Sequence, residues 1–257
     1  MSEPVLALRR VSKGFGPVRV LREVDFTVRA GEVTALVGDN GAGKSTLVKC
    51  IAGLHSVDSG EIAFDGRPVR IRRPKDAVGL GIEVVHQDLA LCDDLDVVQN
   101  MFLGRESTRA GRLDEVGMEL AARRALGSLS VRTVQSVRTR VAALSGGQRQ
   151  IVAIAKAVLW NSRLVVLDEP TAALGVAQTR QVLDLVRRLA ERGLGVVLIS
   201  HNLGDVFEVA DRIAALHLGR MAAELPAREL SQSQVVELIT AGRSGDLGLA
   251  RPDAALV

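Results

Sequence analysis

A run rich in glycine, residues 38–46, is suited to holding phosphate groups, because it reads Gly-Asp-Asn-Gly-Ala-Gly-Lys-Ser-Thr. Backbone N–H groups can crowd around a phosphate only where side chains are absent, which explains Gly38, Gly41 and Gly43. A helix beginning after the loop would add the partial positive charge of its N-terminus. Lys44 would then reach the β- and γ-phosphates of a nucleotide, and the Ser45 hydroxyl would be a ligand of Mg²⁺. The alternative is a glycine-rich turn in which the lysine and serine are incidental.

Two carboxylates, Asp168 and Glu169, follow the apolar run at residues 164–167. At the end of a strand, Asp168 can hold Mg²⁺ through water, and Glu169 can polarise the water that attacks the γ-phosphate. Such a pair is often a solvated turn or the start of a helix. Beside a phosphate loop, the interpretation as a metal ligand and a base is favoured.

A second glycine-containing run, Leu-Ser-Gly-Gly-Gln-Arg-Gln at residues 144–150, leads into a helix that we expect over residues 150–159. A serine hydroxyl and open N–H groups at a helix start would form another anion site. The alternative is an ordinary helix cap. Two phosphate-binding helix starts in one chain suggest that one acts within the chain and the other across to a partner.

The apolar pattern around these motifs predicts an α/β fold. Short apolar or β-branched runs predict strands, and helical spacing predicts a helix over residues 178–192 and another from Ser231, with Gln234 completing a capping box, to Thr240. The first strands would be antiparallel, and the later ones, which alternate with helices, would form a mostly parallel sheet with the nucleotide at its carboxyl ends. Residues 88–160 have a helical pattern and would be a lobe inserted into this core. The strands are expected at residues 5–8, 18–21, 24–28, 33–37, 59–66, 82–85, 164–167 and 195–199.

Composition excludes several other classes of protein. The net charge is only +3 and aromatic residues make up 2% of the 257 residues, so neither a basic nucleic-acid surface nor a base-stacking platform is expected. Two distant cysteines lack metal-ligand spacing. The first residues lack the pattern of a signal peptide, and no apolar run is long enough to span a membrane.

Phe15, which stands on the turn at residues 14–17, has two interpretations. It is either an apolar plug or a platform on which a flat ligand stacks. The phosphate loop downstream favours adenine as that ligand.

Taken in order, these motifs together with Gln87 and His201 resemble the nucleotide-binding subunit of ATP-binding cassette (ABC) transporters over residues 4–241. The resemblance identifies residues 38–46 as the Walker A loop, Gln87 as the Q-loop, residues 144–150 as the signature motif, residues 164–170 as the Walker B strand and His201 as the switch histidine. It implies a P-loop NTPase core with an N-terminal antiparallel β subdomain and an inserted helical subdomain, all in a single domain. Residues 242–257 would be a flexible tail.

The same resemblance implies a role for each motif. Two copies would close head to tail on two ATP molecules, so that Ser145, Gly146 and Gly147 of one copy face the phosphates held by Lys44 of the other. Glu169, His201 and Gln87 would be catalytic; Ser45, Gln87 and Asp168 would hold Mg²⁺; and Phe15 would stack on adenine. The remaining contacts to ATP would come from Gly38, Asp39, Asn40, Gly41, Ala42, Gly43, Lys44, Ser45 and Thr46.

The sequence departs from the common pattern of the family at one position, and it is similar to one branch of the family in two segments. Gly175 occupies a position where many members of the family carry an aspartate, which removes any contact made by that carboxylate. Residues 86–100 and the Ala-Ala-Leu-Gly sequence ending at Gly175 are similar to the branch that imports simple sugars such as ribose, xylose or fructose.

Several partners follow from that branch. With room for one cassette, the chain would work as a homodimer, bound to membrane permease subunits at the cytoplasmic side of the membrane and served indirectly by a sugar-binding protein. The alternative is a non-transport ATPase of the same family acting on nucleic acid or ribosomes. The near-neutral charge and the absence of a long coiled-coil insertion argue against it, so no nucleic-acid partner is expected.

Overall fold

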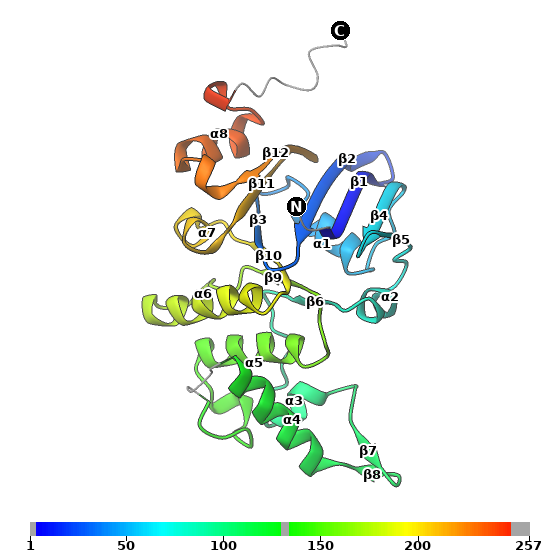
Figure 1. Ribbon diagram of the computed structural model, residues 1–257, viewed down its shortest axis with the longest axis vertical. Coiled ribbons are helices and arrows are strands. Elements are labelled where there is room, and N and C mark those ends of the chain that lie inside the picture. Colours follow the sequence, from blue (N-terminus) through cyan, green and yellow to red (C-terminus); the bar gives the residue numbers. More distant parts are fainter. Residues whose placement is uncertain (1–3, 130–133, 248–257) are drawn as a thin grey trace.

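The computed structural model describes residues 4–129 and 134–247, and its strands form two main sheets and one short hairpin (Figure 1). The predicted α/β fold, with a mostly parallel sheet and an N-terminal antiparallel sheet, is confirmed. Most of the tail expected to be flexible, from residue 248 onward, lies outside the described residues. No helix in the described part of the chain is both long and apolar enough to span a membrane.

The antiparallel sheet has the strand order β2-β1-β4-β5. Its first two strands are longer than predicted, because each continues through a bulge: Arg10 and Glu23 have φ of 49° there, and the pairing register shifts between Leu8 and Val11. The bulge interrupts the alternation of apolar residues, and this makes one long strand look like two short ones. The bounds are Pro4–Phe15 for β1, Val18–Arg29 for β2, Ser59–Phe64 for β4 and Arg67–Val69 for β5.

The larger sheet has six strands in the order β12-β11-β3-β10-β9-β6, all parallel to their neighbours except for the β11–β12 pair. Strands β11 and β12 were not predicted, because alanines and charged residues replace the β-branched residues that indicated the others. The bounds are Val33–Gly38 for β3, Ile82–Val85 for β6, Leu164–Asp168 for β9, Gly195–Ile199 for β10, Arg212–His217 for β11 and Arg220–Pro226 for β12.

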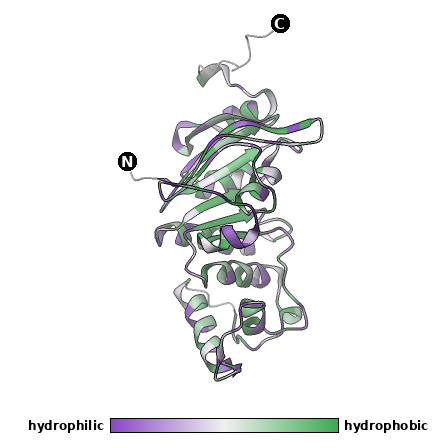
Figure 2. Cartoon of the chain, turned by 90° about the vertical axis from the view of Figure 1, so that its right-hand side faces the viewer, coloured by the Kyte–Doolittle hydropathy of each residue, from purple (hydrophilic) through white to green (hydrophobic). Residues whose placement is uncertain are grey.

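Both faces of the sheet are buried at strands β3, β9, β10 and β11, as apolar parallel strands require. Alternate residues of β9 face opposite sides of the sheet. Val165 and Leu167 pack with helices α5 (Gly146–Val158) and α6 (Val176–Glu191), whereas Leu164 and Val166 pack with α1 (Lys44–Ile51) and the antiparallel sheet. Figure 2 shows the apolar strands at the centre of the molecule. The helices of the core are α1 (Lys44–Ile51), α2 (Pro74–Gly79), α6 (Val176–Glu191), α7 (Leu203–Val209) and α8 (Gln232–Ala241), followed by the 3₁₀ turn Gly245–Leu247.

The segment between β6 and β9 forms the lobe at the bottom of Figure 1. It is mainly helical, as expected, but it also contains a hairpin whose strands are only two residues long. The helix predicted to begin at residue 150 begins at Gly146, because Ser145 caps it. The elements are α3 (Val97–Phe102), β7 (Thr108–Arg109), β8 (Arg112–Leu113), α4 (Glu115–Ser128), the 3₁₀ turn Val141–Ala143 and α5 (Gly146–Val158). The capping box predicted for the last helix is present at Ser231 and Gln234.

Candidate functional site

The glycine-rich loop lies between β3, which ends at Gly38, and α1, which begins at Lys44. Gly43 has φ of +108°, and a Cβ there would lie 3.0 Å from Cδ2 of Leu21 and 3.2 Å from the carbonyl oxygen of Val20. At Gly38 an added Cβ would collide with the carbonyl oxygen of Leu216. The loop therefore needs glycine both for its backbone conformation and for its close packing against β2 and β11.

The ammonium of Lys44 is folded over this loop. Its Nζ donates to the carbonyl oxygens of Gly38, at 2.6 Å, and of Asp39, at 3.0 Å. Burial lowers the pKa of Lys44, and the charges of Glu169, Asp39 and Asp168 act in the opposite direction. A half-buried cation whose partners are mainly neutral carbonyl groups is well placed to receive an anion.

The carboxyl ends of neighbouring parallel strands bring the other motifs to the same edge. Gln87 follows β6, Asp168 ends β9, and His201 follows β10, whose Ile199 is paired with Asp168. They line one cavity of about 770 Å³ together with the phosphate loop. Its lining consists of Val20, Gly38, Asp39, Asn40, Gly41, Gly43, Lys44, Ser45, Thr46, Gln87, Asp168, Glu169, Ile199 and His201.

The acidic pair is held in an unusual way. Glu169 has φ of +51°, a left-handed conformation that side-chain-bearing residues seldom adopt, and its backbone N–H donates to the carbonyl of Ile199 at 2.9 Å. Its Oε2 lies 2.8 Å from Nδ1 of His201. Burial, and next the charge of Glu169, raise the pKa of Asp168. Strained backbone and a perturbed carboxyl in one cavity are features of functional sites.

Ser145, Gly146 and Gly147 do not line this cavity. Ser145 caps α5: its Oγ accepts from the backbone N–H of Gln148 at 3.3 Å, and its own N–H donates to Oε1 of Gln148 at 2.9 Å. Gly147 is buried against Gln178, whose Cβ would lie 3.0 Å from an added Cβ. The ordinary helix cap is thus present, and a phosphate-binding role of this turn stays a prediction that concerns a second chain.

Phe15 is also absent from the lining of the cavity. The residue is 44% exposed, and its ring meets the His55 ring edge-on at 5.0 Å between centroids and lies 5.5 Å from Nζ of Lys13. Ala42, within the loop, is buried and does not line the cavity. The structure therefore leaves open both interpretations of Phe15, as a plug or as a stacking platform.

Sequence reasoning missed Val20 and Ile199 in the cavity, and it missed Asp205 nearby. Asp205 is buried and accepts hydrogen bonds from Thr171 at 2.7 Å and from Asn202 at 3.0 Å. Asn202 caps the helix, and an acidic residue follows it three positions later in the sequence. This spacing is similar to that of a capping box and could have indicated Asp205.

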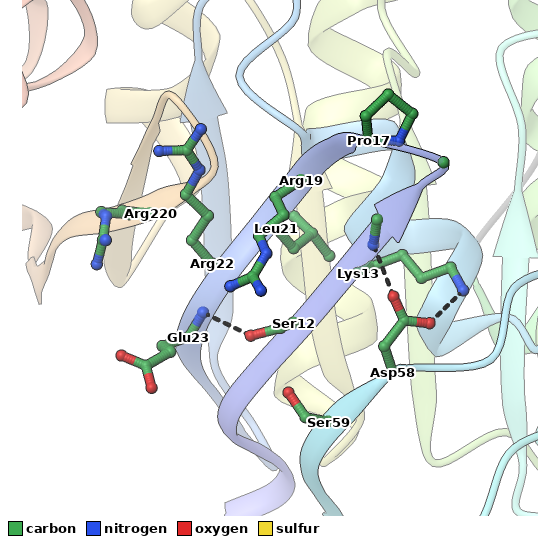
Figure 3. Close-up of a pocket in the computed structure, with 12 residues that line it drawn as sticks. Ser12, Lys13, Pro17, Arg19, Leu21, Arg22, Glu23, Asp58, Ser59 and Arg220 are labelled. Atoms are coloured by element: carbon green, nitrogen blue, oxygen red, sulfur yellow. Dashed lines mark hydrogen bonds and ion pairs between the residues drawn. The ribbon is translucent and has the colours of Figure 1, made fainter.

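A second cavity, of about 860 Å³, lies on the β1–β2 hairpin and contains none of the predicted site residues (Figure 3). Its cations are Lys13, Arg19, Arg22 and Arg220. Asp58 in this cavity accepts from Nζ of Lys13 at 2.7 Å and from the N–H of Gly14 at 2.8 Å. These contacts lower the pKa of Asp58.

Comparisons with known proteins agree with the geometry. The sequence profile of the family described as ABC transporter matches residues 21–172. The fructose import ATP-binding protein of Rhizobium meliloti is 44% identical over 94% of this chain and 95% of its own length. The xylose/arabinose import ATP-binding protein of Sulfolobus acidocaldarius is 43% identical over 95% of this chain and 97% of its own length.

Other similar proteins differ in length or in sequence. The ribose import ATP-binding protein of Chromobacterium violaceum is 41% identical over 94% of this chain, which spans 48% of that protein. An ATP-binding cassette of an ABC transporter, solved in its ADP conformation, superposes with a TM-score of 0.80 over 97% of this chain at 24% identity, a likeness of fold. The family predicted from the motifs is thus confirmed, and the chain belongs to the ABC transporter family as one of its ATP-hydrolysing cassettes.

Proposed function

We propose that the chain drives the import of a simple sugar, with ATP hydrolysis closing and reopening a head-to-tail homodimer. The observation that carries this proposal is the cavity of about 770 Å³, in which the phosphate loop, the acidic pair, Gln87 and His201 meet. The sugar class is supported by the names of the fructose and xylose/arabinose import proteins, which match this chain over nearly their whole length.

Within one chain, the loop binds the phosphates of ATP. Its backbone N–H groups and the N-terminus of α1 attract the β- and γ-phosphates, and Nζ of Lys44 exchanges its two carbonyl partners for phosphate oxygens. Phe15 stacks on the adenine. Glu169 takes a proton from the attacking water, while His201, which contacts the same carboxylate, faces the γ-phosphate.

Ser45, Gln87 and Asp168 fit a magnesium ion. All three line the cavity and offer oxygen atoms, the ligands that Mg²⁺ prefers. Such an ion usually keeps water and phosphate oxygens as its other ligands, so few protein ligands suffice. When bound, Mg²⁺ neutralises charge that develops on the phosphates.

A second copy supplies the other side of each site. Ser145, Gly146 and Gly147 lie outside the cavity of their own chain, yet they sit at the positive start of α5. Within its own chain the turn lies away from the nucleotide cavity. In a head-to-tail dimer it would lie against the γ-phosphate of the ATP that the partner binds. In this arrangement ATP holds the two copies together until it is hydrolysed.

The lobe between β6 and β9 is the proposed docking site for membrane permease subunits. Four of its apolar side chains, Leu103, Leu113, Val116 and Leu120, are about half exposed or more, and a bound permease could cover them. We assign residues 4–241 to one ATPase domain at the cytoplasmic side of the membrane, with residues 88–160 as its helical subdomain. A sugar-binding protein would act through the permease, and no observation favours a nucleic-acid partner.

Mixed dimers test the cross-chain site. In a head-to-tail dimer, combining a Lys44→Ala copy with a Ser145→Ala copy leaves one site intact, whereas combining a doubly substituted copy with an unchanged copy leaves none. If each site were formed within one chain, the two results would be reversed. ATP trapped per dimer, measured in a Glu169→Gln background with differently tagged copies, distinguishes the two arrangements.

Reconstitution tests the sugar. The chain and its permease subunits, assembled in vesicles with the sugar-binding protein, should take up labelled ribose, xylose or fructose when ATP is present. A complex carrying Lys44→Ala is the control. Absence of ATP-dependent uptake of all three sugars, in a complex that still hydrolyses ATP, would contradict the proposed substrate class.

A further inference from the structure

Asp205 lies at the start of α7 and has both of its carboxylate oxygens engaged. Oδ2 accepts from the Thr171 hydroxyl at 2.7 Å, and Oδ1 accepts from the Asn202 side-chain amide at 3.0 Å. Asp205 is only 8% exposed. A buried carboxylate with two defined partners holds those partners firmly, because releasing either one leaves an oxygen without a donor.

The two partners belong to different loops of the site. Thr171 lies two residues after Glu169, on the loop that follows β9. Asn202 directly follows His201, on the loop that follows the neighbouring strand β10. Asp205 therefore ties the loop that carries Glu169 to the loop that carries His201.

Both of these loops need such support. Glu169 has the left-handed φ of +51°, which surrounding contacts must maintain. The His201 side chain is 77% exposed, so little packing fixes its ring. Asn202 is itself well anchored: its N–H donates to Oγ of Ser200 at 3.0 Å, and its Oδ1 accepts from the N–H of Gly204 at 2.9 Å.

We propose that Asp205 is a positioning residue for ATP hydrolysis, which through Thr171 and Asn202 sets the geometry between Glu169 and His201. This inference rests on the proposed roles of Glu169 as base and His201 as its partner. Asp205 does not line the cavity, so its effect is on the rate of the chemical step and not on ATP binding.

Paired substitutions in the full-length chain separate positioning from folding. Thr171→Val removes the hydroxyl while keeping the shape of the side chain, and Thr171→Ser keeps the hydroxyl. Asp205→Ala removes both contacts. Asp205→Asn can keep both, because its oxygen can accept from Asn202 and its amide can donate to Thr171.

We expect Thr171→Val and Asp205→Ala to lower kcat by about 10- to 100-fold, the effect of a small displacement of reacting groups, with KM for ATP unchanged. Thr171→Ser and Asp205→Asn should restore most of the turnover. The double variant Thr171→Val with Asp205→Ala should be no slower than Asp205→Ala, because both substitutions break the same link.

Other outcomes would overturn the proposal. It fails if folded Thr171→Val hydrolyses ATP at the unchanged rate, if Thr171→Ser is as slow as Thr171→Val, or if kcat falls only in proportion to the folded fraction measured by thermal unfolding. Glu169→Gln tests the proposed base separately, because unchanged turnover in that variant would refute the role of Glu169. The positioning role of Asp205 is tested by comparing the turnover of Thr171→Val with that of Thr171→Ser.

Discussion

Nδ1 of His201 lies 2.8 Å from Oε2 of Glu169, although the two residues are far apart in the sequence. The contact arises because β9 and β10 are adjacent and parallel, so the residues just beyond their carboxyl ends meet. The Glu169 side chain is 16% exposed and that of His201 is 77% exposed. A mostly buried acceptor thus orients an exposed ring in the lining of the cavity.

This pair should act as a unit in ATP hydrolysis. Glu169→Gln should lower kcat by about 10²- to 10⁴-fold, the range for a general base, while ATP still binds. His201→Ala should lower kcat as well, and the double variant should be no slower than Glu169→Gln. Steady-state turnover and equilibrium ATP binding measure these effects. Effects that multiply in the double variant would show that the two residues act independently.

Asp168 should reduce the stability of the nucleotide-free protein. Since its pKa is raised in the folded state, ionisation favours the unfolded state, and this cost is fully present above the folded pKa. Asp168→Asn should therefore raise the urea midpoint at neutral pH, and the difference should vanish below about pH 3.9, where the unfolded carboxyl is also protonated. The rate of ATP hydrolysis with Mg²⁺ should nevertheless fall sharply in this variant, because a proposed magnesium ligand is lost. Asp94→Asn, at an exposed position, should change neither quantity, and a lower midpoint for Asp168→Asn at neutral pH would contradict this account.

Gly175 should tolerate, and benefit from, an aspartate. It caps α6 with φ of −75° and ψ of 162°, a conformation open to every residue, and no atom lies within 4 Å of an added Cβ. A carboxylate there can accept from the helix N–H groups, so Gly175→Asp should add about 0.2–0.5 kcal/mol to the free energy of unfolding.

A matched control lies just beyond the other end of the same helix. Gly193 has φ of +86°, so Gly193→Asp should destabilise the protein by about 1 kcal/mol. Urea unfolding measures both variants. If Gly175→Asp also lowers stability, the cap interpretation is wrong.

Arg105 should hold the helical lobe against the core. Its Nη1 lies 2.8 Å from Oε1 of Glu83 on β6, and its guanidinium lies 5.3 Å from the centre of the Trp160 ring. Arg105→Ala would remove the hydrogen-bonded partner of the mostly buried Glu83 carboxylate and leave Lys156 as its neighbouring cation, and we expect a loss of about 1–3 kcal/mol. Trp160 is the single tryptophan in the sequence, so its emission should shift to the red as the ring becomes more exposed.

The control for Arg105 is an exposed ion pair. Arg9 and Glu61 are 3.6 Å apart with side chains 68% and 47% exposed, so Arg9→Ala should change stability by less than about 0.5 kcal/mol. Equal losses of unfolding free energy in Arg105→Ala and Arg9→Ala would mean that the Arg105 contacts stabilise the protein no more than an exposed ion pair does.

The parts of the site that could be predicted from the sequence are those fixed by local chemistry. The loop at residues 38–46 needs glycines for its own backbone, and β10 was predicted with its observed bounds because residues 195–199 are continuously apolar. Asp168 and Glu169 directly follow the apolar run at residues 164–167, so their place at the carboxyl edge of the sheet could be predicted as well.

The parts that could not be predicted depend on contacts between distant segments. Asp205 gains its partner Thr171 only when α7 packs beside the loop after β9. Strand β11 is stabilised by pairing with β3, and its Ala214 and Ala215 carry no strand signal of their own. Whether Phe15 meets a ligand likewise depends on the space around its turn, which the pattern of nearby residues does not fix.

Phe15→Ala distinguishes the two interpretations of that residue. If Phe15 stacks on adenine, the variant should bind ATP about 10- to 100-fold more weakly, as expected from losing about 1–3 kcal/mol of base stacking, and its affinity for inorganic tripolyphosphate should not change. If Phe15 only plugs the turn against His55 and Lys13, the unfolding temperature should fall while both affinities stay the same. Phe15→Trp is the matched control, since it keeps an aromatic face and should retain ATP binding. Calorimetric titration with both ligands and thermal unfolding of the three proteins decide between these outcomes, because tripolyphosphate lacks the adenosine whose base would stack on the ring.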